Sequence, residues 1–161
     1  MDNMIIVGMA DLNTAKSPFA LTTLGLGSCV GVALYDAEVK VAGLAHIMLP
    51  DSTTFSNNGN AAKFADTATI RLLLQMQRLG AKKTNIKAKI AGGAQMFAFN
   101  SNNDSMRIGE KNVEAVLKYL AKHNIPVVAN DTGKNYGRTV TLYAEDGRFV
   151  IKTIGHGSKT L

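Results

Sequence analysis

Apolar residues alternate with polar or small residues in several short segments of the chain, which is the pattern of half-buried strands. Between residues 29 and 35, valine or leucine occupies every second position. Runs of this kind, bounded by turn-forming residues, predict strands at 4–10, 19–25, 29–35, 39–49, 86–94 and 125–130. Residues 138–154 predict a hairpin, because Asp146-Gly147 is a favoured two-residue turn.

Two longer segments carry apolar residues at helical spacing. In residues 61–79, Phe64 is followed by apolar residues at every fourth position, and Gly80 gives the helix a C-terminal stop. Residues 109–124 form a second amphipathic segment. Strands outnumber helices, and we expect a mainly antiparallel or mixed arrangement of the paired strands. The sequence therefore predicts an α+β fold with both helices on one face of a sheet.

Composition limits the class of protein. A chain of 161 residues with 46% hydrophobic and 19% charged residues fits one soluble domain spanning 1–161. We expect no membrane insertion, because no apolar run reaches the roughly 18 residues that span a bilayer. The N-terminus lacks a basic region before its apolar run, so no signal peptide is expected. A single cysteine cannot form an internal disulfide and favours a cytoplasmic location.

The charge balance is basic, with 18 Lys and Arg residues against 12 Asp and Glu residues and a net charge of +6. Such an excess favours an acidic partner. The lysines are dispersed, however, and aromatic residues make up only 6% of the chain. We therefore expect no nucleic-acid partner. An acidic protein partner and a basic surface without a specific partner both remain open.

The lone cysteine, Cys29, follows a short segment of small residues, Gly25-Leu26-Gly27-Ser28. Small residues let the backbone turn tightly and leave room for a substrate beside the sulfur. The backbone N–H groups of Gly27, Ser28 and Cys29 could stabilise an oxyanion. The alternative is that Cys29 is a small buried core residue.

His46 lies in an otherwise apolar predicted strand. A hairpin that turns about Ala37-Glu38 would place His46 directly opposite Cys29, with Cβ atoms about 4.5–5.5 Å apart. The imidazole could then take the thiol proton and make the sulfur a nucleophile. A shift of one residue would put the two side chains on opposite faces. The alternative is a hydrogen-bonded core histidine.

A nucleophile and base of this kind require a third group that orients the imidazole. Thr22 and Thr23 precede the cysteine, and the hydroxyl of either could orient the imidazole. The alternative is that both are ordinary strand residues with no role in a site. The other two histidines, His123 and His156, share no metal-ligand spacing with His46, so no metal or cofactor is expected.

The same residues occur in motifs that resemble a known family. In order along the chain, "TLGLGSCVGVALYD", "AGLAHIMLPDS", "KFADTA", "KIAGGAQMF", "NVEAVLKYL" and "NDTG" are similar to CheD, the chemoreceptor glutamine deamidase family. The resemblance covers about residues 4–154. It implies a single-domain, layered α/β/β sandwich similar to the catalytic domains of deamidating toxins.

The resemblance also implies an activity. Cys29 would be the nucleophile, His46 its base and Thr23 the third catalytic residue. The reaction would convert selected glutamines of methyl-accepting chemotaxis receptors to glutamate. In some members of the family, receptor glutamyl methyl esters are hydrolysed as well. The phosphatase CheC would be a second partner.

Other substrate-binding residues are expected at and beyond the end of the strand at 86–94. Gly92 and Gly93 would turn the chain and expose Phe97 near the site, as an apolar contact for receptor helices or CheC, unless Phe97 and Phe99 both belong to the core. Two other functions remain open. The chain could be a non-catalytic adaptor that binds receptors or CheC, or a cysteine peptidase.

Overall fold

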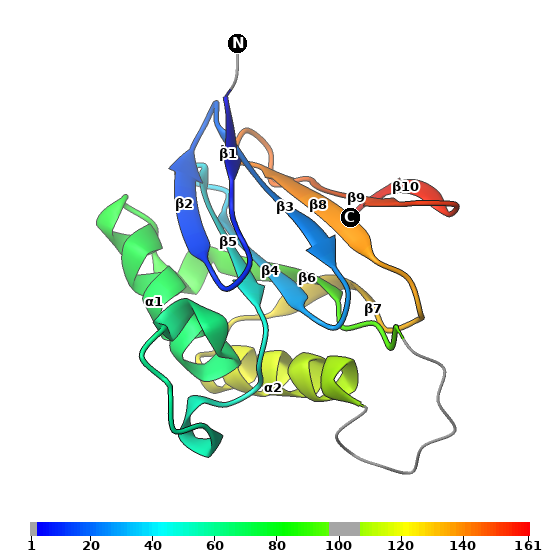
Figure 1. The fold of residues 1–161 in the computed structure, drawn as a ribbon. Coiled ribbons are helices and arrows are strands. Elements are labelled where there is room, and N and C mark those ends of the chain that lie inside the picture. The colour runs from blue at the N-terminus through cyan, green and yellow to red at the C-terminus, as the bar shows by residue number, and fades with distance from the viewer. Residues whose placement is uncertain (1–2, 97–106) are drawn as a thin grey trace.

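The computed structural model describes residues 3–96 and 107–161. It consists of two stacked five-stranded sheets with two helices on the outer face of one of them (Figure 1). This is the predicted α+β layered architecture. We call the sheet beside the helices the central sheet and the other the outer sheet.

The central sheet has the strand order β2–β5–β4–β6–β7. Its strands are β2 (Leu12–Lys16), β5 (Val41–Ile47), β4 (Val30–Asp36), β6 (Ile86–Gly92) and β7 (Val127–Thr132). The outer sheet has the order β1–β3–β8–β9–β10. Its strands are β1 (Met4–Ile6), β3 (Ala20–Leu26), β8 (Arg138–Tyr143), β9 (Phe149–Thr153) and β10 (Gly157–Thr160).

The helices α1 (Ala65–Arg78) and α2 (Ile108–Lys122) cover the central sheet. Single turns of 3-10 helix occur at Ser52–Thr54, Ala61–Lys63 and Lys83–Asn85. No helix within residues 3–96 and 107–161 is long and apolar enough to cross a membrane.

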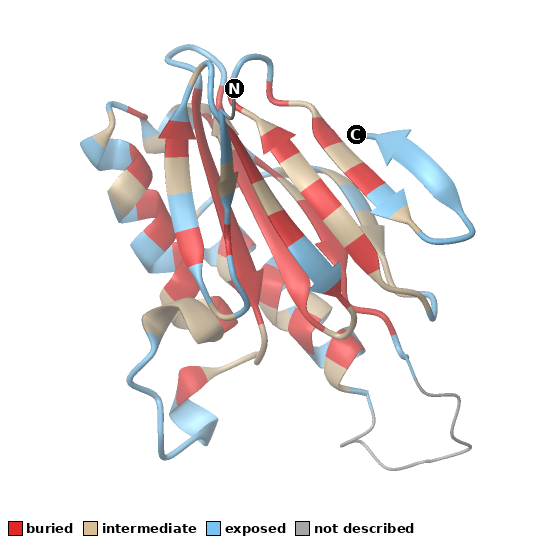
Figure 2. Ribbon diagram, turned by 45° about the horizontal axis from the view of Figure 1, so that its top comes forward, coloured by how far each residue is buried: buried red, intermediate tan, exposed pale blue. Residues whose placement is uncertain are grey.

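Strands β4 and β5 are buried on both faces because they lie in the middle layer. Alternate residues of β4 (Val30, Val32 and Leu34) pack toward the helices, whereas Cys29 and Ala33 belong to the cluster between the sheets. Figure 2 shows buried residues concentrated through the middle of the sandwich and the exposed strand β10 at one edge. A residue in this inner layer is shielded from solvent from above and below.

The strand pairing is mainly antiparallel, as expected, but two strand pairs are parallel. β1 pairs with β3 and β6 pairs with β7 in parallel. Two strands were not predicted separately, and both have weak patterns. β2 begins after the strand expected at 4–10, where no element was predicted, and all four residues of β10 are exposed. An exposed edge strand is held by backbone hydrogen bonds and needs no buried side chains. Its sequence therefore lacks the alternation of apolar residues that predicts a strand.

Candidate active site

Cys29 lies at the end of the connection from β3 in the outer sheet to β4 in the central sheet. The pairing of β3 with β8 has a bulge between Thr23 and Leu26, where Gly25 adopts a φ of +69°. A residue without a side chain accommodates this left-handed conformation most readily. The bulge bends the end of β3 so that the chain can cross to β4 directly before Cys29.

The cysteine loop packs against the end of β6. The N–H of Gly93 donates to the Cys29 carbonyl oxygen at 2.8 Å, and that of Ala94 donates to Gly27 O at 2.9 Å. A Cβ on Gly92 would overlap the Cys29 carbonyl oxygen, so this approach requires glycine. Since its N–H is already engaged, Gly93 shapes the loop and is not free to bind a substrate oxygen.

The backbone N–H groups of Gly27, Ser28 and Cys29 find no acceptor among the described residues. They are therefore unengaged backbone donors in the cysteine loop. The Ser28 carbonyl oxygen accepts a hydrogen bond from the Asn112 side chain at 3.0 Å. Phe97, which we expected as an apolar contact near the site, lies outside the described residues.

The expected direct opposition of Cys29 and His46 is wrong by two residues. His46 pairs with Gly31, and the last pair toward the site is Val30 with Ile47. The connection comprises residues 37–40, because β4 and β5 remain paired as far as Asp36 and Val41. The buried Asp36 carboxylate accepts the N–H of Glu38 at 3.0 Å and fixes this turn.

A shift of two residues preserves the face on which a side chain lies, since strand side chains alternate with period two. His46 and Cys29 are consequently diagonal neighbours on the surface between the two sheets. Backbone positions in such a relationship are about 7–8 Å apart, a separation that a long side chain can bridge. The register keeps the thiol and the imidazole on the same face of the central sheet.

Thr23 of the outer sheet contacts His46 of the central sheet. Its Oγ1 lies 2.7 Å from His46 Nδ1, and the same hydroxyl donates to the Val7 carbonyl oxygen at 2.7 Å. A hydroxyl has one proton, which is used on Val7, so Thr23 accepts the proton of His46 Nδ1. The neutral imidazole therefore carries its free lone pair on Nε2.

His46 Nε2 is buried and has no hydrogen-bond partner among the described residues. His46 is 1% exposed, Thr23 0% and Cys29 8%. Burial lowers the pKa of the His46 imidazole and raises the pKa of the Cys29 thiol, because both charged forms lose solvation. The resting pair is thus a neutral thiol and a neutral imidazole whose basic nitrogen is unused.

Two buried polar residues near the site were not anticipated. Asn112 lies on the inward side of α2, and Arg138 begins β8. The Arg138 guanidinium pairs with Asp131 at 3.0 Å and donates to the carbonyl oxygens of Gly92 and Gly133. Asn112 is the first residue of the segment "NVEAVLKYL", but the sequence assigned a role to neither residue, because each contacts backbone atoms that are distant along the chain.

The remaining histidines lie away from this cluster. His123 follows the last turn of α2, and His156 stacks on Tyr136 with ring centroids 4.2 Å apart. Across the described parts of the chain, no group of three histidine, cysteine or acidic side chains could hold a metal ion.

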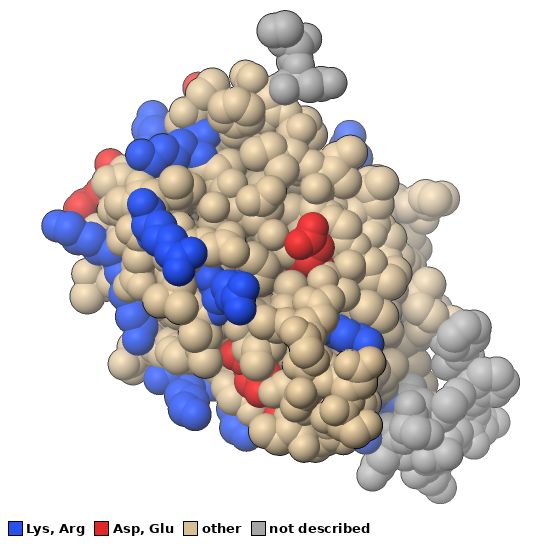
Figure 3. Space-filling model, turned by 60° about the vertical axis from the view of Figure 1, so that its left-hand side comes forward, with Lys and Arg blue, Asp and Glu red and all other residues tan. Residues whose placement is uncertain are grey.

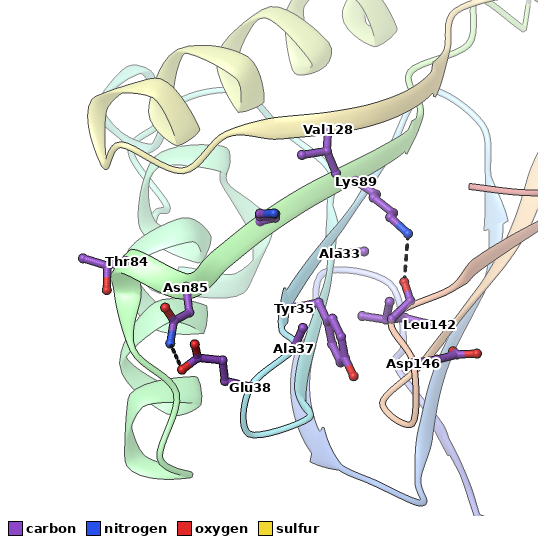
Figure 4. Close-up of a pocket in the computed structure, with 12 residues that line it drawn as sticks. Ala33, Tyr35, Ala37, Glu38, Thr84, Asn85, Lys89, Val128, Leu142 and Asp146 are labelled. Carbon is purple, nitrogen blue, oxygen red and sulfur yellow. Dashed lines mark hydrogen bonds between the residues drawn. The ribbon is translucent and has the colours of Figure 1, made fainter.

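A cavity of about 400 Å³ opens between the sheets at the far end of β4 (Figure 4). Tyr35 and Lys89 line it, and the Lys89 ammonium donates to the carbonyl oxygens of Gly147 and Leu161 at 3.0 and 2.8 Å. Glu38 accepts a hydrogen bond from Asn85 at its rim. These polar groups are engaged with the protein itself, and the cavity contains neither Cys29 nor His46.

The fold and the site define an α+β layered protein with a hydrogen-bonded histidine–threonine pair and a buried cysteine on the surface between its sheets. A model of the CheD family, described as "CheD chemotactic sensory transduction", matches residues 48–153. The chain belongs to the CheD family.

Curated relatives match over essentially the whole chain. The "Probable chemoreceptor glutamine deamidase CheD" of Lachnoclostridium phytofermentans is 54% identical over 161 residues, covering 100% of both proteins. The protein of that name from Caldanaerobacter subterraneus subsp. tengcongensis is 56% identical, covering 99% of each. The "Chemoreceptor glutamine deamidase CheD" of Halalkalibacterium halodurans is 52% identical, covering 100% of each. Among solved structures, Bacillus licheniformis hypothetical protein YfiH has a TM-score of 0.45 at 16% identity, over 76% of this chain and 50% of that one.

Proposed function

We propose that this protein is a protein-glutamine deamidase that converts selected glutamines of chemotaxis receptors to glutamate. The names of its relatives support this substrate. The observation that carries the chemistry is the hydrogen bond from His46 Nδ1 to Thr23, since it leaves Nε2 as an unpaired base on the face that also holds Cys29.

In the proposed mechanism, His46 Nε2 takes the proton of the Cys29 thiol as the sulfur attacks the glutamine carboxamide carbon. Collapse of the tetrahedral intermediate breaks the C–N bond, and His46 returns the proton to the departing ammonia. The thioester that remains is attacked by water, which His46 deprotonates. Collapse of the second tetrahedral intermediate breaks the C–S bond and releases glutamate, and His46 returns its proton to the departing sulfur, which restores the thiol.

The neutral resting pair suits this sequence of steps. An imidazole that is already protonated could not accept the thiol proton, and burial keeps His46 neutral. Thr23 would stabilise the imidazolium that forms, because its oxygen accepts the Nδ1 proton. The unengaged N–H groups of Gly27, Ser28 and Cys29 are the candidate donors to the oxyanion.

The surface charge supports an acidic partner. Figure 3 shows the face that carries α1, where Lys and Arg outnumber Asp and Glu, and Arg71 and Arg78 of that helix are exposed. A net charge of +6 would speed encounter with acidic receptor helices. We extend the proposal to a cytoplasmic location, to CheC as a second partner and to hydrolysis of receptor methyl esters.

The direct test is incubation of the protein with receptor cytoplasmic fragments, followed by peptide mass spectrometry and an ammonia assay. Each deamidated glutamine gains the mass difference between an amide NH₂ and a hydroxyl, with one ammonia released. Fragments that bind but remain unmodified would favour the alternative of a non-catalytic adaptor. Cleavage of the fragment backbone would instead indicate a peptidase.

A further inference from the structure

A single buried side chain connects the two strand ends that carry the proposed nucleophile and base. Asn112 lies on the stripe of α2 that faces the sheet, together with Gly109, Val116 and Leu120. It is fully buried. Its Nδ2 donates one hydrogen bond to Ser28 O at 3.0 Å and another to Met48 O at 2.9 Å.

These two carbonyl groups lie close along the chain to the proposed nucleophile and to the proposed base, respectively. Ser28 directly precedes Cys29, and Met48 lies two residues after His46. The ladder between β4 and β5 ends one step earlier, at the pair Val30 and Ile47. Beyond that pair, a side-chain amide from α2 connects the two strands.

The chain after β5 has already left the sheet at this point. The N–H of Met48 donates to Lys63 O at 2.9 Å, beside the single turn that precedes α1. The Asn112 amide is therefore the hydrogen-bonded link from Met48 back toward the cysteine loop. Without it, nothing described in the structure ties the Ser28 carbonyl to the strand that carries His46.

The amide has one workable orientation. Reversing it would place Oδ1 against two carbonyl oxygens, so the NH₂ group must face the strand ends. In this orientation Oδ1 is buried without a partner among the described residues. A buried unpaired acceptor is unfavourable, and leucine of similar size would suit an inward helical stripe. Packing alone therefore does not explain an asparagine here.

We propose that Asn112 is a positioning residue whose amide holds the ends of β4 and β5 together so that Cys29 and His46 can exchange a proton. This inference rests on the proposed cysteine–histidine chemistry. Asn112 touches backbone carbonyls and not the reacting atoms, so it acts by fixing the distance between the two strands. Small displacements of reacting groups are costly, about 100-fold in rate for 1 Å.

The test compares Asn112→Leu with a control on the same helix. Tyr119 also ties α2 to the chain after β5, through a hydrogen bond to Asp51 at 2.9 Å, but does not reach the strand ends. Tyr119→Phe therefore removes a helix tether of the same kind. Because the chain has one cysteine, the rate of alkylation by iodoacetamide reports on Cys29 alone. It is measured against pH, with His46→Ala supplying the unassisted rate.

We expect Asn112→Leu to lower alkylation at neutral pH toward the rate of His46→Ala, while both converge with the wild type at high pH. On receptor fragments, kcat should fall about 100-fold with little change in KM. Tyr119→Phe should match the wild type in both assays. If Asn112→Leu does not fold, Asn112→Ser, which keeps one donor, should give intermediate rates.

Wild-type alkylation and kcat in a folded Asn112→Leu or Asn112→Ser protein, alongside a slow His46→Ala, would overturn the positioning role and leave the proposed chemistry intact. Equal rates for the wild type and His46→Ala would instead overturn the cysteine–histidine coupling, and the role of Asn112 with it. An equal fall in the Asn112 and Tyr119 variants would show a general effect of loosening α2 and would also overturn the proposal.

Discussion

Thr23 accepts the Nδ1 proton of His46 across the interface between the two sheets, with 2.7 Å between the oxygen and the nitrogen. The Thr23 hydroxyl proton is committed to the Val7 carbonyl oxygen, so this threonine cannot donate to the imidazole. A residue of the outer sheet thereby selects the tautomer of a residue in the central sheet. The proposed catalytic base depends on the packing of one sheet on the other.

Replacing Thr23 by valine should impair catalysis more than stability. The change preserves volume but removes the acceptor of the Nδ1 proton, so we expect kcat to fall by about 100-fold. It also leaves a buried carbonyl and a ring N–H unpaired, at about 1–3 kcal/mol of unfolding free energy. Steady-state ammonia release and thermal denaturation measure the two effects.

Thr22→Val is the matched control for that variant. The Thr22 hydroxyl donates to Val140 O at 2.8 Å within the outer sheet and makes no contact with His46. We expect a comparable stability loss with kcat unchanged. Equal kcat values for the two valine variants would contradict the role assigned to Thr23.

Cys29→Ala should abolish ammonia release from receptor fragments, a loss of at least roughly 1,000-fold, because the nucleophile is removed. The side chain is small and the site lies between packed sheets, so we expect the protein to fold. Receptor binding, followed by pull-down or calorimetry, should persist. Ammonia release at the wild-type rate would refute the thioester mechanism.

In the pH profile of kcat/KM, the midpoint of the acid limb should lie below pH 6.5, the ordinary pKa of histidine. Burial lowers the pKa of His46, so the imidazole keeps its basic nitrogen free to lower pH than an exposed histidine would. A profile of kcat/KM between pH 5 and pH 8 tests this. An acid limb well above 6.5 would mean that the base is not the buried neutral His46.

Stability should fall as the pH is lowered through the same region. The unfolded chain binds a proton at residue 46 at pH values near and below 6.5, whereas the folded chain does not until its lowered pKa is reached. Since the unfolded state binds more protons in this window, the free energy of unfolding rises with pH. His46→Gln should flatten the dependence of Tm on pH.

His123 provides a comparison for that slope. Partial burial, together with Lys83 and Lys122, also lowers the pKa of His123. His123→Gln should therefore reduce the pH dependence of Tm without altering the acid limb of kcat/KM. If His123→Gln shifted the acid limb of kcat/KM, the assignment of the base to His46 would be wrong.

Gly92→Ala should disrupt the cysteine loop. Gly92 has a φ of +110°, and an added Cβ would overlap the Cys29 carbonyl oxygen. We expect a loss of about 1–3 kcal/mol in unfolding free energy from the strained backbone, and reduced kcat because Cys29 must move. Gly59→Ala, where an added Cβ meets nothing, is the control for denaturation and ammonia assays.

Salt should weaken substrate encounter but not the chemical step. Raising NaCl from about 50 to 300 mM shortens the distance over which exposed charges interact. The buried thiol and imidazole are shielded from this screening. We expect kcat/KM on receptor fragments to fall while kcat at saturation stays nearly constant. A kcat/KM that is insensitive to salt would argue against an acidic receptor surface as the partner of the basic side chains.

The sequence by itself determined most of the elements and named the candidate residues of the site. Alternation gave the strands around Cys29 and His46, and helical spacing gave α1 and α2, because the periods of strands and helices are local properties of the chain. The resemblance to CheD pointed to Thr23. The sequence also supported a hairpin between residues 29–35 and 39–49, which the structure contains as β4 and β5.

Only the tertiary structure decided the register and the supporting contacts. The turn residues allowed more than one loop, and the buried Asp36 carboxylate fixes the one that pairs His46 with Gly31. The contacts of Asn112 with Ser28 and Met48 join segments that are distant along the chain. A local pattern shows which face a side chain occupies, but the partner it meets depends on how separate elements pack.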